Sequence, residues 1–377
     1  MPTIVITGTG LFTPAESVSN EALVESFNTF VQRYNDAHAS EIEAGECEAL
    51  APSSAEFIEA ASGIRRRYVV DREGILDPER MVPRLRERSD EEPGVLCEMS
   101  VHAAREALEA AGRTPADVDC VIAACSNLER AYPAVAIEVQ DALGCGGYAY
   151  DMNVACSSAT FGIQNAANAL QAGTARCVLL VNPEVCTGHL DFRDRDSHFI
   201  FGDACTAVVL ERSDDAVADE RWEILGMRLS TQFSNNIRND FGFLNRTSGS
   251  HAGSRGDSGG RLFRQQGRKV FKEVVPMVAA LITDHLDQLG LAAADVSRFW
   301  LHQANLAMNQ LIARRVLGRD ADEKQAPVIL DEFANTSSAG SVICFHRHRA
   351  DLGSGDVGIL CSFGAGYSAG SVALRKH

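Results

Sequence analysis

Residues 153–162 read NVACSSATFG, and residues 333–341 read FANTSSAGS. Both stretches place Ser-Ser-Ala at the entry to a helix of small residues, and an apolar strand follows each, ARCVLLVNPEV in one case and GDVGILCSFGAG in the other. Upstream, DVDCVIAACSN at 117–127 is mirrored by DVSRFWLHQAN at 295–305. This self-similarity indicates an internal duplication and predicts two halves related by a pseudo-twofold axis.

Short apolar runs alternate with longer stretches of helical periodicity along the whole chain. The runs are rich in β-branched side chains, which favours strands over buried helices. Strands are expected at 4–7, 120–124, 177–181, 207–210, 222–225, 298–301, 328–330, 358–362 and 371–374, and helices at 98–111, 157–172, 269–289 and 303–317. This alternation predicts an α/β fold with mostly buried sheets.

The boundary between the halves is expected in the polar segment 213–220, which gives halves of 1–215 and 220–377. Two other stretches are expected to be loops or insertions. Residues 36–55 are acidic and rich in small residues, and residues 245–260 (NRTSGSHAGSRGDSGG) are rich in glycine and serine.

The composition of the 377 residues excludes several classes of protein. The net charge of −16 argues against non-specific nucleic-acid binding, which needs a basic surface. No apolar run is long enough for a membrane span, and the start lacks the features of a signal peptide, so a cytoplasmic protein is expected. The eleven cysteines include no C-x-x-C pair, so no metal site is predicted and most are expected to be buried, reduced thiols.

Cys156 has a different context from the other cysteines. It follows the strand-like YAYDMNVA and opens a helix that runs to Gly173. Unpaired backbone N–H groups and the positive end of a helix dipole stabilise a thiolate, which is the nucleophilic form. A buried structural cysteine at a tight turn is the alternative, and position alone does not separate the two.

Two further polar residues are candidates for the same site. His302 follows three apolar residues in FWLHQAN, a placement that suits the carboxyl end of a sheet, where α/β sites form. Asn335 lies in the repeat-mate of the Cys156 turn, so the duplication places it opposite Cys156; a helix N-cap is the alternative. The turn 364–366 (Gly-Ala-Gly) could bring backbone N–H groups to a ligand oxygen. A papain-like hydrolase also uses Cys, His and Asn, but within other local signatures.

These motifs resemble the thiolase superfamily, and most closely the β-ketoacyl-acyl-carrier-protein synthase III group. The resemblance extends from the first strand to the last and implies a layered αβαβα core of two duplicated halves. The matching segments are VACSSATFG, LHQANLAMN, ANTSSAGS, IFGDACTAVVLE at 200–211, FGAGYSAGS at 363–371, SGIRRRYV at 62–69 and VITGTGLFTPA at 5–15.

The resemblance also implies a mechanism. Cys156 takes an acyl group from an acyl-CoA, malonyl-acyl carrier protein loses carbon dioxide, and the enolate attacks the acyl-cysteine in the step that begins fatty-acid synthesis. His302 and Asn335 donate hydrogen bonds to the thioester oxygen of the enolate. The backbone N–H groups of Cys156 and Ala365 hold the oxyanion. No cofactor is implied besides the coenzyme A thioester, which is a substrate.

Other family positions carry over less directly. Arg195 and Phe57 match residues that contact coenzyme A, whereas Ala61 replaces a family arginine, and the segment before Phe57 is longer than usual. The identity of the acyl donor and its chain length therefore stay open. Tyr132 matches an aromatic residue that crosses a dimer interface, which implies a homodimer.

A basic segment is informative in so acidic a chain. RLFRQQGRKVFK at 261–272, together with the helix after His302, offers cations to an acidic acyl carrier protein. The predicted docking residues are Arg268, Lys269, Lys272, Arg314 and Arg315.

Three alternatives to decarboxylative condensation stay open. Two are enzymes that use the same three residues: a non-decarboxylating acyl–acyl condensation and a cysteine-dependent acyltransferase of a specialised pathway. The third is a non-catalytic partner in a heteromeric condensing complex. Such partners usually lose the nucleophile, so the presence of Cys156, His302 and Asn335 argues against it.

Overall fold

The computed structural model describes residues 2–240 and 262–377. The loop predicted at 245–260 lies outside the described residues, as does Arg261 of the basic segment. The helices are α1 (Asn20–Ala37), α2 (Ala39–Glu43), α3 (Ala55–Ser62), α4 (Arg72–Leu76), α5 (Val95–Ala110), α6 (Val135–Leu143), α7 (Ser158–Ala172), α8 (Gly267–Leu289), α9 (Leu306–Leu317), α10 (Leu330–Phe333) and α11 (Ala339–Arg347). The strands are β1 (Ile4–Phe12), β2 (Glu16–Ser19), β3 (Arg66–Val69), β4 (Cys120–Ala124), β5 (Tyr148–Met152), β6 (Cys177–Val185), β7 (Asp203–Arg212), β8 (Trp222–Thr231), β9 (Ile237–Asn239), β10 (Phe263–Gln265), β11 (Val296–Leu301), β12 (Val357–Gly364) and β13 (Ser368–Lys376).

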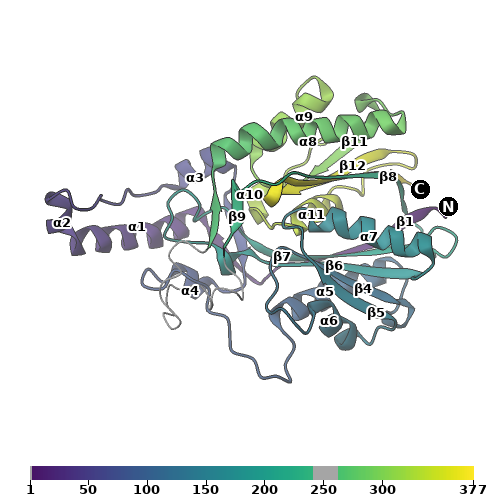
Figure 1. Cartoon of the computed structure of the whole chain (residues 1–377), viewed down its shortest axis with the longest axis horizontal. Coiled ribbons are helices and arrows are strands. Elements are labelled where there is room, and N and C mark those ends of the chain that lie inside the picture. Colours follow the sequence, from purple (N-terminus) through teal and green to yellow (C-terminus); the bar gives the residue numbers. More distant parts are fainter. Residues whose placement is uncertain (1, 241–261) are drawn as a thin grey trace.

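The elements stack in five layers, in the order helices, strands, helices, strands, helices (Figure 1). Helices α8 and α9 cover one outer face, α5 and α6 cover the other, and α7 and α11 lie between the sheets. The central apolar cluster combines side chains of α7 and α11, such as Ile163 and Val342, with strand residues such as Leu180 and Leu360. The layered αβαβα arrangement expected from the resemblance is therefore observed.

The two halves repeat one strand order. In the first half the order is β5-β4-β6-β7-β1, and in the second it is β11-β12-β13-β8. The directions repeat as well, because β4 pairs in parallel with β6 as β11 does with β12. The pairs β6–β7 and β7–β1 in the first half, and β12–β13 and β13–β8 in the second, are antiparallel, and β5 adds a further parallel strand beside β4. A short pairing of β1 with β8 joins the two halves into one continuous sheet. This repetition supports the duplication, and the boundaries 1–215 and 220–377 remain a prediction.

The repeat also extends to individual hydrogen bonds. Asp117 accepts a 2.8 Å bond from the backbone N–H of Thr114, at the short 3-10 helix that precedes β4. Asp295 accepts a 2.9 Å bond from the N–H of Ala292 at the equivalent helix before β11. Each aspartate belongs to one copy of the Asp-Val pair that marked the repeat in the sequence.

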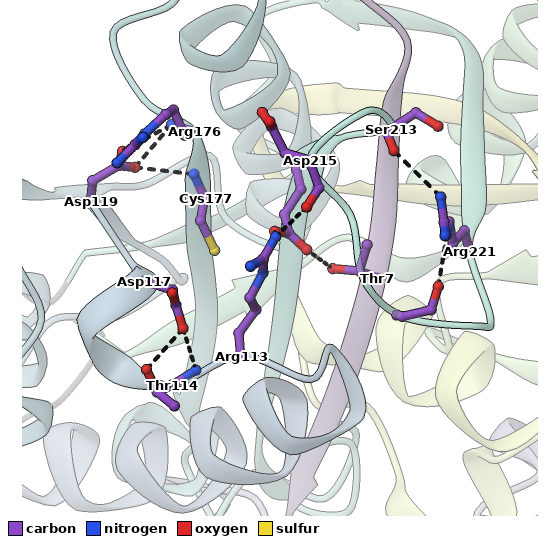
Figure 2. A network of polar contacts seen from close by, with 12 residues as sticks. Thr7, Arg113, Thr114, Asp117, Asp119, Arg176, Cys177, Ser213, Asp215 and Arg221 are labelled. Carbon is purple, nitrogen blue, oxygen red and sulfur yellow. Dashed lines mark hydrogen bonds and ion pairs between the residues drawn. The ribbon is translucent and has the colours of Figure 1, made fainter.

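The connection between the halves is tied to the first half (Figure 2). Arg113, just after α5, donates to buried Glu211 at 2.7 Å and to the backbone oxygen of Asp215. Glu211 also accepts a 2.8 Å bond from Thr7 on β1, and Arg221 donates to the backbone oxygen of Ser213. These bonds hold the segment between β7 and β8 against Arg113, which follows α5.

Glycines in β1 let α5 approach the sheet closely. A side-chain carbon at Gly8 would lie 2.0 Å from the carbonyl oxygen of Ala107, and one at Gly10 would lie 2.0 Å from that of Ala103. The glycines of β1 and the alanines of α5 both permit this close approach, because a larger residue in the strand or in the helix would push the two layers apart.

Two expectations about secondary structure were wrong. Residues 328–330 form no strand; Leu330 begins α10, and the N–H of Ile329 donates to the side-chain oxygen of Gln303 at 3.1 Å instead of to a neighbouring strand. Residues 36–55 are not entirely loop, since they include the end of α1 and all of α2. These two helices extend away from the body of the molecule (Figure 1).

The extended α1 is joined to the chain that returns from it. Asn35 exchanges two hydrogen bonds with the backbone of Leu50, at 2.9 and 3.0 Å. Asn28 exchanges two with Ser53, at 2.8 and 3.0 Å. The long segment before Phe57 is therefore a defined helix-and-return structure that leads into α3.

Candidate active site

Cys156 lies in the turn between β5 and α7. The preceding residue, Ala155, has φ 48°, in the left-handed region that a residue with a side chain seldom adopts. The turn is held from both sides: the N–H of Val154 donates to Ser158 Oγ at 2.8 Å, and Ser157 Oγ donates to the carbonyl oxygen of Ser368 on β13 at 3.0 Å. Ser157 thus links the turn to the second half instead of capping α7.

The turn that contains Asn335 is built in the same way. Ala334 and Ser337 have φ 55° and 49°, and Asn335 Oδ1 accepts from the N–H of Ser337 at 2.9 Å. Ser338, not Asn335, is the N-cap residue of α11, so the helix-cap alternative does not apply. Ser337 Oγ donates to Cys156 Sγ at 3.4 Å, which brings this turn into contact with the cysteine.

His302 immediately follows β11. Its N–H donates to the carbonyl oxygen of Cys361 on β12 at 2.8 Å, and its ring packs edge-on against Phe363 with 5.3 Å between ring centres. The predicted helix 303–317 begins only at Leu306, where Asn305 caps it, so His302 lies in a connection and not in the helix. The residue is 1% exposed, and its Nδ1 has no hydrogen-bond partner among residues 2–240 and 262–377. Burial lowers the pKa of His302 to about 4, so the imidazole is neutral near pH 7.

The turn after β12 lies against Cys156. A side-chain carbon at Gly364 would lie 2.6 Å from Cys156 Cβ and 3.0 Å from its sulfur, so the turn can approach only because residue 364 has no side chain. Ala365 follows directly, and a backbone hydrogen bond from Ala365 favours the thiolate of Cys156. The 364–366 turn thus lies beside the cysteine, and its role as an oxyanion hole stays a prediction.

One cavity of about 570 Å³ contains all of these groups. Its polar end brings together Cys156, His302, Asn335 and Ala365. Its remaining walls are mainly apolar and include Phe57, Ile64, Phe199, Ile200, Phe201, Ile237, Phe263, Val270, Phe271, Val274, Met308 and Phe363. Cys156 from the β5–α7 connection, His302 from the β11–α9 connection and Asn335 from the α10–α11 connection thus line one space open to a ligand, which a purely structural cysteine does not need.

The surroundings of Cys156 disfavour its thiolate, contrary to the expectation from the helix terminus. Burial raises the pKa of the thiol to about 11, and the charge of nearby Glu184 acts in the same direction. Hydrogen bonds from Ser337 and from backbone groups oppose the increase without cancelling it. The position of Cys156 at a helix terminus favours the thiolate, but the cost of removing a thiolate from water is larger.

Glu184 was not identified from the sequence. It is fully buried on β6 and accepts bonds from Ser126 N at 2.9 Å, Ser126 Oγ at 2.6 Å and Ser338 N at 3.1 Å, as well as from Ser338 Oγ. Ser126 belongs to the first half, whereas Ser338 begins α11 just after Asn335 and Ser337. Glu184 therefore fixes the Asn335 turn to the half that contains Cys156. A glutamate inside the apolar run VLLVNPEV was the available signal.

Phe57 and Arg195 lie together at the edge of the site. Phe57 lines the cavity, and the guanidinium of Arg195 stacks over its ring at 4.3 Å. Arg195 Nε also donates to the carbonyl oxygen of Pro52 at 2.7 Å, so it joins the return from α1 to the cavity wall. Tyr132 is 84% exposed and does not line this cavity.

The predicted docking cations differ in their surroundings. Arg268, Lys269 and Lys272 are exposed on the first turns of α8 and form no ion pair among the described residues, and Arg268 also lines the cavity. Arg315 is exposed and unpaired as well, within the same described part of the chain. Arg314 instead pairs with Asp320 at 3.2 Å and lines a separate groove on the other side of α9. Across residues 2–240 and 262–377, no helix has the length and apolar character to cross a membrane.

Two segments of the chain match family models, and whole proteins match it over most of its length. Residues 150–232 match the family described as 3-oxoacyl-[acyl-carrier-protein] synthase III, and residues 286–376 match the family of its C-terminal part. The β-ketodecanoyl-[acyl-carrier-protein] synthase of Pseudomonas aeruginosa PAO1 is 66% identical over 354 residues, which cover 94% of this chain and 100% of that protein. The β-ketoacyl-[acyl-carrier-protein] synthase III of Erythrobacter litoralis is 30% identical over 333 residues, which cover 88% and 93%.

Solved structures agree with this assignment. The priming β-ketosynthase of the R1128 polyketide pathway superposes with a TM-score of 0.76 at 25% identity, covering 99% of this chain and 96% of that one. The 3-oxoacyl-[acyl-carrier-protein] synthase III of Aquifex aeolicus gives 0.75 at 24% identity with 99% of both chains covered, which shows the fold. The predicted family and fold are confirmed, and the chain belongs to the β-ketoacyl-acyl-carrier-protein synthase III family of thiolase-fold condensing enzymes.

Proposed function

We propose that this enzyme transfers an octanoyl group from octanoyl-CoA to Cys156 and condenses it with malonyl-acyl carrier protein to give β-ketodecanoyl-acyl carrier protein. The main support for this function is that Cys156, His302 and Asn335 line one cavity. The chain length follows from the 66% identity to a β-ketodecanoyl synthase. Because a decarboxylative condensation adds the two carbons left from malonyl, a ten-carbon product needs an eight-carbon donor.

The first half-reaction is acyl transfer to Cys156. The neutral imidazole of His302 accepts the thiol proton, and Cys156 Sγ bonds to the acyl carbon. The carbon–sulfur bond to coenzyme A then breaks, and the proton leaves with the coenzyme A thiol. The N–H groups of Cys156 and Ala365 stabilise the oxyanion formed between these events, and loss of one such donor typically costs about 3–4 kcal/mol.

The second half-reaction forms the carbon–carbon bond. Malonyl-carrier protein loses carbon dioxide, and the electron pair of the broken bond forms an enolate. The ring N–H of neutral His302 and the Nδ2 of Asn335 donate to its oxygen. Asn335 Oδ1 is already bonded to Ser337, which supports an orientation with Nδ2 free to donate. The enolate carbon attacks the acyl-cysteine, the bond from the acyl carbon to Cys156 Sγ breaks, and Cys156 leaves as a thiolate that takes up a proton from water.

The walls of the cavity suit a chain of several methylenes. Phe199, Phe201, Phe263 and Phe271 provide apolar surface beyond Cys156. Each methylene buried there contributes about 0.8 kcal/mol, or roughly a fourfold preference for each added carbon until the space is filled. This dependence supports a donor longer than acetyl.

The unpaired cations of α8 support docking of an acidic carrier protein at the cavity mouth. Arg268, Lys269 and Lys272 lie on the helix whose Val270 and Phe271 line the cavity, so a carrier bound there would lie close to Cys156. Arg315 extends this surface. Arg314 contributes less, since its charge is already paired with Asp320.

We also propose a homodimer that works in the cytoplasm. Strand β5 lies at an end of the sheet, so one of its edges is free to pair with another strand. Exposed Tyr148 belongs to β5, and exposed Ile137 and Tyr132 lie on α6 and in the connection before it. A second copy would cover these side chains.

The intact mass of the protein after incubation with acyl-CoAs from acetyl to dodecanoyl tests this function. We expect a gain of one acyl group on the Cys156 peptide, with octanoyl loading best, and release of carbon dioxide when malonyl-carrier protein is added. Loading without that release would favour the simple acyltransferase. No loading with any donor would remove acyl-CoA as the substrate.

A further inference from the structure

The turn after β12 contains two consecutive residues in the left-handed region. Gly366 has φ 69°, and Tyr367 has φ 47°. Glycine adopts this conformation freely, but a bulky residue with a side-chain carbon does so only where its surroundings hold it. The contacts of Tyr367 therefore decide the shape of the turn.

Tyr367 is held at both its backbone and its side chain. Its carbonyl oxygen accepts from the N–H of Gln232 at 2.9 Å. Its hydroxyl donates to Glu273 Oε2 at 2.6 Å and accepts from Asn236 Nδ2 at 2.9 Å. Asn236 also donates to the same glutamate at 3.1 Å, which closes a three-residue network around a side chain that is 3% exposed.

The network joins three separate parts of the second half. Glu273 lies on α8, Asn236 lies between β8 and β9, and Tyr367 ends the turn that begins at Gly364. The other end of this turn contacts Cys156, since a side chain at Gly364 would collide with it. A shift of Tyr367 would therefore move the backbone N–H of Ala365 relative to the cysteine.

We propose that Tyr367, held by Glu273 and Asn236, is a positioning residue that fixes the Gly364–Ala365 backbone against Cys156 for acyl transfer. Tyr367 does not line the cavity and acts only through the turn. The inference rests on the proposed role of the Ala365 N–H as an oxyanion donor. The position of the Ala365 N–H would then depend on hydrogen bonds among Tyr367, Asn236 and Glu273 of α8.

The network should affect acyl transfer and condensation but not decarboxylation. Acyl transfer and condensation both form an oxyanion at the acyl carbon, next to Ala365. Decarboxylation of malonyl thioester forms its charge on the other side of the site, next to His302 and Asn335. Weakening the network should slow the first two steps and spare the third.

The test compares Tyr367→Phe and Glu273→Ala with wild type. Tyr367→Phe keeps the ring and removes both bonds of the hydroxyl. We expect the rate of Cys156 acylation and the kcat of condensation to fall roughly tenfold to a hundredfold, with KM for octanoyl-CoA unchanged. Carbon dioxide release from malonyl-carrier protein without an acyl donor should stay within about twofold of wild type. Combining the two substitutions should be no worse than Tyr367→Phe alone, because both break the same bond.

Two further variants control for a general loss of structure. Asp284→Ala removes a bond from the same helix to Arg228 on β8, at 3.2 Å, and should leave all three rates unchanged. Glu273→Gln keeps an oxygen acceptor for Tyr367 and should restore most of the acylation lost in Glu273→Ala. Equal loss of all three rates, or normal acylation by Tyr367→Phe, would overturn the proposal. Failure of wild type to acylate would instead overturn the proposed function.

Discussion

Ser337 Oγ lies 3.4 Å from Cys156 Sγ and donates a hydrogen bond to it. The two residues come from equivalent turns of the two halves, and both turns contain a left-handed residue, Ala155 in one and Ser337 in the other. The duplication therefore places a hydroxyl donor of one half on the nucleophile of the other. Because burial raises the pKa of the Cys156 thiol, this donor is one of the few groups that favour its thiolate.

Replacing Ser337 with alanine should slow the loading of Cys156. A hydrogen bond to a charged group is worth about 1.5–3 kcal/mol, and sulfur is a weaker acceptor than oxygen, so we expect a loss of roughly tenfold. The rate of acyl-enzyme formation from octanoyl-CoA at pH 7.5, followed by mass, measures it. Ser341→Ala removes a buried hydroxyl on α11 that bonds Ser362 instead, and should load normally. Equal loss in both variants would contradict the assignment.

The raised pKa of Cys156 predicts a steep pH dependence of its alkylation. With a pKa of about 11, the thiolate is a small fraction near pH 7 and grows about tenfold for each pH unit up to pH 9. The rate of carbamidomethylation by iodoacetamide, measured on the Cys156 peptide, should rise accordingly. A plateau below pH 8 would show a lower pKa in solution. Protection by octanoyl-CoA would confirm that the alkylated cysteine is the acylated one.

Gly364 should not tolerate a side chain. Its φ of 176° is open to any residue, so the effect of Gly364→Ala would come only from the new carbon, which would lie 2.6 Å from Cys156 Cβ. We expect acylation to fall at least a hundredfold, because displacement of either the sulfur or the oxyanion turn disrupts the attack. Far-ultraviolet circular dichroism should stay unchanged. Gly353→Ala, at a glycine where an added carbon would meet only Asp356 Oδ2 at 3.7 Å, controls for loss of a glycine and should keep its activity.

Replacing the cations at the start of α8 should weaken the binding of the carrier protein and leave the loading of Cys156 unchanged. Lys269→Glu with Lys272→Glu should raise KM for malonyl-carrier protein about tenfold or more and leave octanoyl loading unchanged, because no ion pair among the described residues neutralises either lysine. The defect should shrink at high salt. Arg105→Glu, on the opposite outer layer, changes the net charge by the same amount as Lys269→Glu alone and is the control for that single variant. An equal effect of Arg105→Glu would mean that net charge, and not this surface, governs binding.

Much of the fold could be predicted because its signals are local. The Ser-Ser-Ala repeat and the paired Asp-Val segments identified the duplication, and the strand 120–124 was predicted with its observed bounds. The failed strand at 328–330 shows the limit: its composition suits a strand, but the side chain of distant Gln303 satisfies the backbone there. No local pattern in the sequence reveals such a long-range hydrogen bond.

The three candidate site residues, which line one cavity, could be named from the sequence, whereas the groups around them could not. Cys156, His302 and Asn335 each stand in a recognisable motif. The pKa of Cys156 depends on how deeply the turn is buried, which the sequence does not state. Glu184 and Tyr367 act through bonds to residues far along the chain, so their importance appears only when Ser338 and Glu273 are seen beside them.

His302→Ala offers the clearest division between the two half-reactions. Burial lowers the pKa of His302 to about 4, so above about pH 5 the neutral ring has one N–H that can donate to an enolate oxygen. Its removal should lower malonyl decarboxylation by a hundredfold to a thousandfold, the usual cost of a lost donor to a developing charge. Acylation should fall much less and should recover at high pH, where hydroxide replaces the base. Rapid-quench measurement of acyl-enzyme and of carbon dioxide on the same variant gives both rates. If the two fall equally at every pH, His302 acts on a step that both share, and the assignment of the enolate to His302 and Asn335 is wrong.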